Sequence, residues 1–373
     1  MVTASKIHAT DSDVLIIGDG VIGLSIALEL ARAGARTHII GVRRDGSASG
    51  AAAGLLAPSI GRLQPGVRQF FESSLARYPA FVDRLRQFDR ELSLVEGLIQ
   101  VSAAAPDSAP GASRLDAAAL ARIEPELAAP NGAVLHAGDG AIDNVRLMSA
   151  LSLAVEHESA LTVTRDDRAT QINVESSALE VRTASARSFR ARCVVLAAGA
   201  WSAQIAGIPR PLPVMPLKGQ MLAFHARSLR HAIAGDDVYL VPRKDEILAG
   251  ATVEHAGFDT TVEDRAIEQM RRAATSLCPA LGDAQVIRRW AGIRPATPDL
   301  LPILGADPDV PGFIYACGHS KNGILLAPET AVAISRLAQG LPAGTDLSMF
   351  SVGRFGAIAT TGTAADSSQH FDR

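Results

Sequence analysis

The sequence is poor in cysteine. The 373-residue chain has three, Cys193, Cys278 and Cys317, which lie far apart and form neither a zinc-type C-x-x-C pair nor the even set of a disulfide framework. The histidines are scattered in the same way, so we expect no metal site. Widely separated, unpaired cysteines are typical of a reduced compartment, and we therefore expect a cytoplasmic protein.

Long apolar runs and an excess of one charge are also absent. The most apolar stretches, such as 194–201 and 324–327, are too short to span a bilayer, and residues 1–11 contain no apolar signal core. The formal net charge of -3 gives no reason to expect a nucleic-acid partner. No Ser/His/Asp set and no pair of carboxylates has the spacing of a hydrolytic site. A soluble protein is expected, with peripheral membrane contact left open.

The chain begins with a strand, turn, helix and strand pattern that carries three glycines. A short apolar run leads into Gly18, Gly20 and Gly23, a helical pattern follows at 21–33, and a second apolar run covers 37–40. This order is typical of a dinucleotide-binding βαβ unit. Gly18 allows the tight turn, Gly20 lets the backbone approach a diphosphate, and Gly23 lets the helix pack against the strand. The helix start supplies N–H groups to the phosphates.

These glycines do not decide between a nicotinamide and a flavin. An acidic residue normally ends the second strand and bonds the adenosine ribose, but this chain has Gly41 there and reaches Asp45 only after two arginines. Arg43 or Arg44 could stack on the adenine, meet a phosphate, or select the 2′-phosphate of NADP. The alternative that we favour is a solvated loop, with the ribose contacted by backbone groups.

At 373 residues and 47% hydrophobic content, the chain is long enough for two domains, and it shows no internal repeat. The tail from about 356 has the composition of a disordered segment. We expect loops at 46–54, which has small residues, and at 103–114, on the surface. Helices are expected at 67–92, 116–124, 262–277 and 324–340. The expected β-structure is β-type residues at 160–181, a buried strand within 192–201, antiparallel strands at 214–222, 238–243 and 246–252, and a strand entering a glycine-rich turn at 314–323.

Further motifs follow the glycine fingerprint in a fixed order. They are 51–54 (AAAG), 199–202 (GAWS), 218–220 (KGQ), 239–243 (YLVPR), 250–252 (GAT), 290–295 (WAGIRP) and 318–328 (GHSKNGILLAP). Through these motifs, which cover about 13–339, the chain resembles the D-amino-acid-oxidase-like FAD-dependent oxidoreductases. Among them it is most similar to the bacterial glycine oxidases linked to thiamine biosynthesis.

The resemblance implies an α/β plus α+β architecture. A Rossmann-like FAD-binding domain of the glutathione-reductase type would be joined to a second, mainly antiparallel-sheet substrate domain. The FAD-binding domain would be discontinuous and the flavin would lie between the domains. The implied boundaries are 11–85, 145–215 and 294–345 for the FAD-binding domain and 86–144 and 216–293 for the substrate domain, with 356–373 as a disordered tail.

The resemblance also implies FAD held without a covalent bond. Related sarcosine oxidases tether the flavin through a cysteine just before a Pro-Asp pair, and the nearest position here is Gly292, which has no sulfur. The expected cofactor-binding residues are Gly18, Gly20, Val21, Ile22, Gly23, Gly41, Ser49, Ala53, Gly54, Leu55, Gly199, His319, Asn322, Gly323 and Ile324.

Three residues are expected to bind the substrate. A guanidinium matches a carboxylate in two-pronged fashion, and Arg294 corresponds to the family's substrate arginine. Tyr239 corresponds to a tyrosine whose hydroxyl contacts the same carboxylate. Lys321 stands where the closest relatives carry arginine, which keeps the charge but loses the fork geometry. Asp237 stands near a histidine position of some relatives and could favour a cationic or secondary amine.

The resemblance therefore predicts oxidation of glycine or a related small amino acid, such as sarcosine or a small D-amino acid, by hydride transfer to the flavin. Products would be a 2-oxo acid, ammonia and hydrogen peroxide, with molecular oxygen as the electron acceptor. Alternatives are a dehydrogenase that passes electrons to a quinone or a protein, an NADP-linked reductase, and a non-catalytic FAD-binding protein. A homo-oligomer is possible for all of them.

Overall fold

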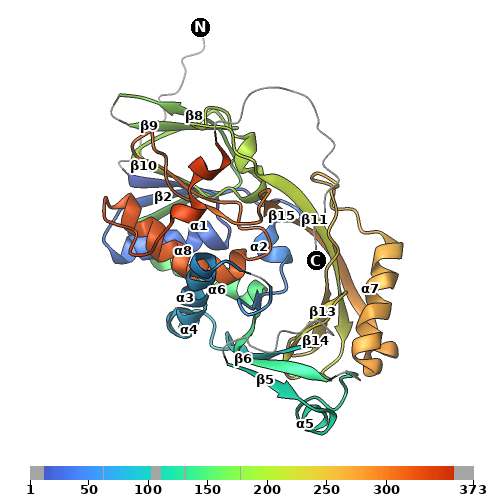
Figure 1. Cartoon of the computed structure of the whole chain (residues 1–373). Helices are drawn as coiled ribbons and strands as arrows, with labels where there is room; N and C mark the ends of the chain where they lie inside the picture. The colour runs from blue at the N-terminus through green and yellow to red at the C-terminus, as the bar shows by residue number, and fades with distance from the viewer. Residues whose placement is uncertain (1–11, 62, 102–110, 130–131, 177, 357–373) are drawn as a thin grey trace.

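The computed structural model describes residues 12–356 except 62, 102–110, 130–131 and 177, and it contains two β-sheets (Figure 1). The predicted disordered tail lies outside the described residues apart from Gly356, and so does most of the expected loop at 103–114. In the part of the chain that is described, no helix combines the length and apolarity needed to cross a membrane.

The first sheet contains the N-terminal βαβ unit. Its parallel strands lie in the order β17-β10-β1-β2-β7, with β16 antiparallel at one edge and the β8–β9 hairpin extending from β10. The central strands are buried almost throughout, as parallel strands covered on both faces are. The strands are β1 (Ser12–Ile17), β2 (Thr37–Ile40), β7 (Leu161–Thr164), β8 (Ala169–Val174), β9 (Leu179–Thr183), β10 (Ser188–Leu196), β16 (Ile303–Ala306) and β17 (Phe313–Cys317).

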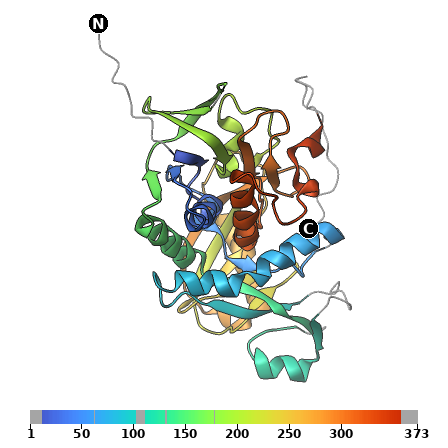
Figure 2. The ribbon, with the colours of Figure 1, turned by 90° about the vertical axis from the view of Figure 1, so that its left-hand side faces the viewer.

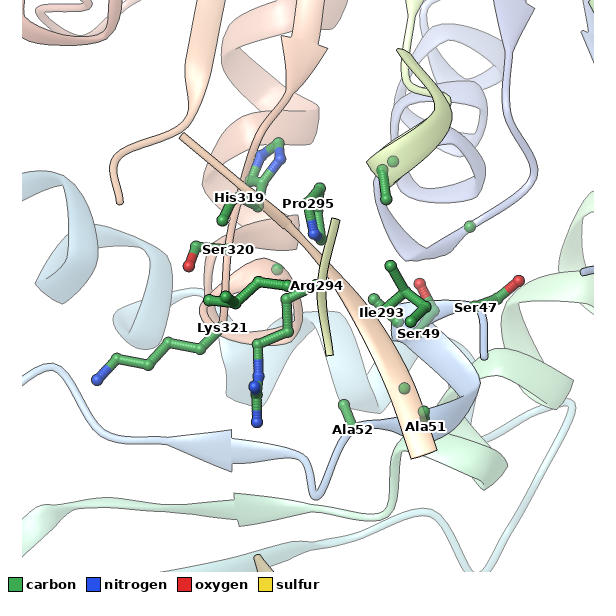
Figure 3. Close-up of a pocket in the computed structure, with 18 of the residues that line it drawn as sticks. Ser47, Ser49, Ala51, Ala52, Ile293, Arg294, Pro295, His319, Ser320 and Lys321 are labelled. Atoms are coloured by element: carbon green, nitrogen blue, oxygen red, sulfur yellow. The ribbon is translucent and has the colours of Figure 1, made fainter. Parts of the chain in front are cut away.

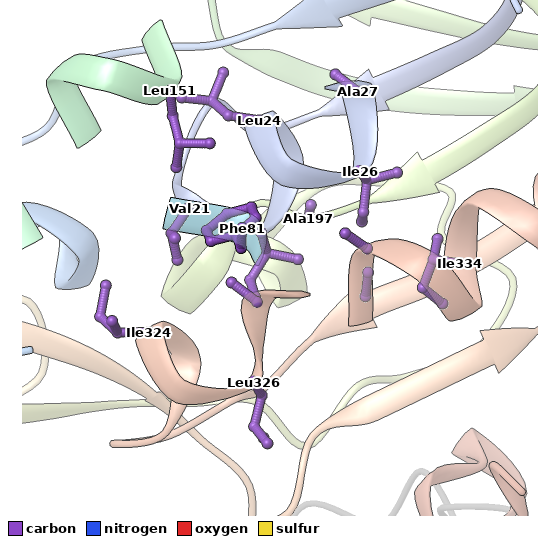
Figure 4. Packing of buried hydrophobic residues seen from close by; sticks show 14 of the residues in the cluster. Val21, Leu24, Ile26, Ala27, Phe81, Leu151, Ala197, Ile324, Leu326 and Ile334 are labelled. Atoms are coloured by element: carbon purple, nitrogen blue, oxygen red, sulfur yellow. The ribbon is translucent and has the colours of Figure 1, made fainter. Parts of the chain in front are cut away.

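Three helices, α1 (Val21–Arg32), α6 (Asn144–His157) and α8 (Gly323–Ala338), cover one face of this sheet. Figure 2 shows α1 and α8 side by side in this layer. Their apolar sides, including Leu24 and Ile334, form the largest core cluster together with the sheet (Figure 4). Because α1 and α8 both begin at the same edge of the sheet as the glycine loop, their N-termini are available to one ligand.

The second sheet is mixed but mainly antiparallel, as the resemblance implied. Its order is β15-β11-β14-β13-β12-β4-β6-β3, with β5 paired to β6, and only the pairing of β12 with β4 is parallel among the described strands. The strands are β3 (Leu55–Leu56), β4 (Leu94–Gln100), β5 (Ala112–Leu115), β6 (Ala133–Ile142), β11 (Met215–His225), β12 (Ala232–Ala234), β13 (Tyr239–Pro242), β14 (Glu246–Gly250) and β15 (Val286–Ala296).

Helix α7 (Asp264–Leu277) packs on the outer side of this sheet, away from the first sheet (Figure 1). It buries Ile267, Met270 and Ala274, which recur at helical spacing, and leaves its other side charged. Helix α5 (Ala117–Ile123) lies near the far end of the same sheet and is capped by the Asp116 carboxylate, which accepts from the Ala119 amide at 2.7 Å. The sheet's inner side is therefore left to face the first sheet.

The structure corrects three local predictions. The helix expected at 67–92 is two helices, α3 (Pro65–Ala76) and α4 (Tyr78–Leu85), because Pro79 cannot donate to a preceding turn and starts a new helix. The described end of the expected loop at 103–114 enters a strand, since β5 pairs with β6. The small-residue loop at 46–54 contains one helical turn, α2 (Ala48–Ala51).

Candidate active site between two sheets

One cavity of about 1220 Å³ lies between the two sheets. Its lining comes from the glycine loop, α2, the ends of β10 and β17, the start of α8, and strands β11, β13 and β15. All of the predicted cofactor and substrate residues line it except Gly23 and Gly41. Residues separated by more than 300 positions in the sequence, such as Gly18 and Ile324, therefore meet at one place, as the resemblance implied.

The glycine loop closes the first-sheet side of the cavity. Gly18 has φ +120°, and a Cβ there would lie 2.2 Å from the Ala197 carbonyl oxygen. A Cβ on Gly23 would lie 1.9 Å from the Gly18 carbonyl oxygen, so Gly23 acts by close packing behind the loop and not by facing the cavity. Gly20 is the N-cap of α1 and offers no side chain to block a diphosphate.

Ser49 in α2 and Asn144 at the start of α6 brace this loop. The Val21 amide donates to Ser49 Oγ at 3.0 Å, and Asn144 Nδ2 donates to the carbonyl oxygens of Ser49 (2.6 Å) and Gly50 (3.1 Å). Arg243, at the turn after β13, donates in turn to Asn144 Oδ1. Ser49 was predicted from the sequence as a cofactor-binding residue, but the roles of Asn144 and Arg243 were not, because nothing near them in the sequence indicates this contact.

The start of α8 faces the same cavity. The chain reaches it through Gly318, whose φ is +72°, and through His319, which is buried. Burial lowers the pKa of His319 to about 3, and Nε2 lies 3.3 Å from Thr330 Oγ1, so this ring is neutral. In Figure 3 it points toward α8. The unpaired N–H groups of the first turn of α8 are thus the polar feature directed at a ligand.

The first turn of α8 is completed by α3 and α4. Pro328 cannot donate to the Ile324 carbonyl, which instead accepts from the Tyr78 hydroxyl. One residue further, Ser74 Oγ donates to the Leu325 carbonyl at 2.7 Å and accepts from the Glu329 amide at 3.2 Å. These contacts fix the position of the helix start despite the proline within the helix.

β15 brings Arg294 into the cavity beside Tyr239. Nη1 of Arg294 donates to the carbonyl oxygens of Lys218 (3.3 Å) and Thr252 (3.0 Å), which holds the guanidinium in place. A Cβ on Gly219 would lie 2.3 Å from Nη2, so this position of the arginine depends on glycine. Burial raises the pKa of Tyr239, against the opposing effect of Arg294, and keeps the phenol protonated as a donor. A bound carboxylate would therefore meet two fixed donors.

A buried lysine supports Arg294 from behind. Lys218 is fully buried, and its ammonium lies 3.0 Å from Asp259 and 3.6 Å from Glu254. Gln220 Nε2 donates to Glu254 at 2.8 Å. Since the Lys218 carbonyl accepts from Arg294, this paired network fixes the Arg294 guanidinium through the backbone. This role of Lys218 was not predicted from the sequence, where the residue was only part of the KGQ motif.

Lys321 extends into the cavity on the same side as Arg294 (Figure 3). Its side chain is exposed to the cavity, yet the surrounding protein lowers its pKa, and the Arg294 guanidinium lowers the pKa further. No described carboxylate forms an ion pair with it. Two cations that repel each other in an enclosed space favour an anionic ligand between them.

In the natural chain, we expect KM for a carboxylate substrate to rise at alkaline pH, and we expect Lys321→Arg to remove this rise. The pKa of Lys321 lies below its ordinary value of 10.5, so its charge is lost as pH rises through this lowered pKa, whereas arginine stays charged. KM for glycine, measured from pH 7 to 10, should rise more in the natural chain than in the variant. The substrate amine also titrates over this pH range, but its effect on KM is the same for the natural chain and the variant. Identical profiles would contradict a substrate role for Lys321.

Arg44, Gly292 and Cys317 line other parts of the cavity. The guanidinium of Arg44 lies 4.7 Å from the ring centre of Trp201, which stacks on Phe258. This stack was not predicted from the sequence. Gly292 leaves no room for a tethering cysteine, since a Cβ there would lie 2.5 Å from the Ala51 Cβ. Cys317 does line the cavity, but burial raises its pKa to about 12, which makes it a poor nucleophile.

Asp139 anchors the loop that follows β3. Ile60, in this loop, lines the cavity. The carboxylate of Asp139 accepts from Ser59 Oγ (2.9 Å) and the Ser59 amide (3.3 Å), and burial raises its pKa from 3.8 to about 6. The folded state therefore binds a proton more tightly than the unfolded state, and stability is lost as pH rises from about 4 to 6. Asp139→Asn should raise Tm relative to the natural chain at pH 7.5 but not at pH 4. An equal Tm difference at both pH values would exclude this titration.

Together the fold and the site define a class of protein. A glycine-loop βαβ unit that borders a large cavity between two sheets is typical of a dinucleotide-dependent oxidoreductase. A family model described as DAO, FAD dependent oxidoreductase, matches residues 13–337, and the chain belongs to this family. Its cofactor is FAD, and the bare glycine cradle fits the FAD diphosphate.

Curated relatives and solved structures agree with this assignment. The chain is 35% identical to the bifunctional protein ThiO/ThiG of Synechocystis sp., covering 93% of this chain but only 54% of that protein. It is 32% identical to the glycine oxidase of Pseudomonas aeruginosa, covering 88% of this chain and 94% of that protein.

Two crystal structures share the fold over nearly their whole length. The glycine oxidase of Geobacillus kaustophilus has a TM-score of 0.84 at 28% identity, covering 92% of this chain and 99% of that one. The iminodiacetate oxidase of Chelativorans sp. BNC1 has a TM-score of 0.82 at 29% identity, covering 91% and 98%. The chain is thus a glycine-oxidase-like member of the family.

Proposed function

We propose that this chain oxidises glycine or a related small amino acid, such as sarcosine or a small D-amino acid. The observation that carries the proposal is the Arg294 guanidinium, fixed by two backbone carbonyls beside Tyr239 in the cavity. The overall reaction converts the amino acid, water and molecular oxygen into a 2-oxo acid, hydrogen peroxide and an amine, which is ammonia for a primary amino acid and methylamine for sarcosine.

The residues of the chain supply positioning and charge. Arg294 and Tyr239 hold the substrate carboxylate, and Lys321 adds a second positive charge nearby. FAD, when bound, supplies the acceptor for the hydride from the substrate Cα. The start of α8 stabilises the negative charge that this transfer brings to the site. No general base is required, because a substrate amine that is already neutral can lose hydride directly.

An anaerobic absorbance titration of the purified holoprotein tests the proposal. Glycine, sarcosine and D-alanine are added in turn, and at least one should bleach the oxidised flavin bands. Admitting air should then restore the bands quickly. If the bands return slowly in air but quickly with a quinone, the protein is a dehydrogenase. If no amine bleaches the flavin, the proposed reaction is wrong and a non-catalytic FAD protein is favoured.

A substrate with two carboxylates is a second candidate. Lys321 has no described acidic partner, and its position beside Arg294 would suit a second anionic group. The structural similarity to an iminodiacetate oxidase supports the same idea. In the anaerobic titration, bleaching by iminodiacetate at lower concentration than by glycine would establish this preference. Lys321→Met should then affect iminodiacetate more strongly than glycine.

A further inference from the structure

The end of β2 lacks the acid that dinucleotide sites normally use for the adenosine ribose. Gly41 occupies that position, and the next acidic residue, Asp45, follows two arginines. One of these, Arg44, stacks on Trp201. The hydroxyls of an adenosine ribose at this edge of the sheet would therefore need a different polar partner.

The backbone of Gly41 does not supply a free donor. Its amide donates to the Thr164 carbonyl at 2.9 Å, and its carbonyl accepts from the Asp167 amide at 3.2 Å. Both bonds extend the pairing between β2 and β7. The amide of Gly41 is thus not available as a donor to the ribose, and the expectation of backbone contacts there stays a prediction.

The side chain of Asp19 fills the space that is left by Gly41. A Cβ on Gly41 would lie 2.2 Å from Asp19 Cγ and 2.3 Å from Oδ2, so the carboxyl group lies where an acid at position 41 would begin. Asp19 is half-buried, lines the cavity and stands between Gly18 and Gly20. Among the described residues, no group donates a hydrogen bond to this carboxylate. A carboxylate in this place is thus directed at a ligand.

We propose that Asp19 binds the adenosine ribose of FAD in place of the missing strand-end acid. Its two oxygens only accept, and they match the 2′ and 3′ hydroxyls of the ribose, which both donate. The charge of Asp19 also opposes a 2′-phosphate, which argues against the NADP alternative. Glycine at 41 and aspartate at 19 are complementary, because a side chain at 41 would displace the carboxylate. The inference rests on FAD binding and not on which amine is oxidised.

The test measures FAD affinity by titrating the apoprotein and following flavin fluorescence. Asp19→Asn keeps the shape but removes the charge, and we expect the Kd for FAD to rise about tenfold or more. The decisive ligand is FAD with a 2′-deoxyadenosine moiety. The natural chain should bind it about tenfold more weakly than FAD, and Asp19→Asn should bind the two with nearly equal Kd. If the variant discriminates as strongly as the natural chain, the proposal is wrong.

A swap of the two positions provides an independent test. Gly41→Glu alone should weaken FAD binding, because its Cβ would lie 2.5 Å from the Asp19 Cβ as well as against the carboxyl group. Asp19→Gly alone should weaken it by removing the acceptor. The double variant Asp19→Gly, Gly41→Glu should bind FAD better than either single variant and regain discrimination against the 2′-deoxy analogue. A double variant that remains as weak as the singles would overturn the complementary role.

Discussion

Replacement of Arg294 by methionine is expected to lower kcat/KM for glycine by about a thousandfold, because it removes a fixed, partly buried charge that pairs with the substrate carboxylate. Arg294→Lys should recover only part of the activity, since an ammonium cannot reproduce the fork. FAD content should stay unchanged in both variants, because Arg294 is held through the β11 and β14 side of the cavity. Steady-state kinetics with flavin quantification checks both expectations.

The matched control is Arg289, on the same strand. It is exposed, and within the described part of the chain it pairs with the exposed Asp264, so Arg289→Met should leave kcat/KM nearly unchanged. If Arg294→Met retained most of the activity toward every amine that bleaches the flavin, the carboxylate would be bound elsewhere. In that case the second cation, Lys321, would be the first residue to test.

Gly18→Ala is expected to abolish FAD binding or folding. The φ of +120° is unfavourable for alanine, and the new Cβ would lie 2.2 Å from the backbone oxygen of Ala197, which cannot move without disturbing β10. Purified protein should be colourless or recovered in low amounts. Gly50→Ala is the control, because a Cβ there meets nothing within 4 Å and the residue lies in α2, between the cavity-lining residues Ser49 and Ala51. A yellow, stable Gly18→Ala protein would contradict the tight-turn argument.

Local patterns in the sequence predicted the nucleotide-binding unit well. The apolar runs and the three glycines identify β1, α1 and β2, since this unit is continuous in the chain and its constraints are local. The position of the cavity, in contrast, depended on motifs separated by hundreds of residues, and only the family resemblance connected them. The boundary between α3 and α4 shows the opposite case, because Pro79 was visible in the sequence but its effect was underestimated.

The parts that could not be predicted depend on tertiary contacts. Nothing near Asn144 indicates that its amide supports Ser49 and Gly50, since these residues are about 95 positions away. The contact between Asp19 and Gly41 has the same character. Each residue alone looks like a departure from the usual pattern, and only their proximity shows that one departure compensates for the other.

The contacts that run from Arg243 through Asn144 to Ser49 couple the free energies of two regions of the cavity. They connect a turn of the second sheet to the amide of Val21 at the diphosphate loop, so neither binding region can change its geometry without cost to the other. Such coupling is reciprocal: if the diphosphate orders this path, an ordered path must strengthen binding of the diphosphate by the same factor. We therefore expect FAD binding to stabilise the turn after β13 as well as the glycine loop, before any substrate arrives.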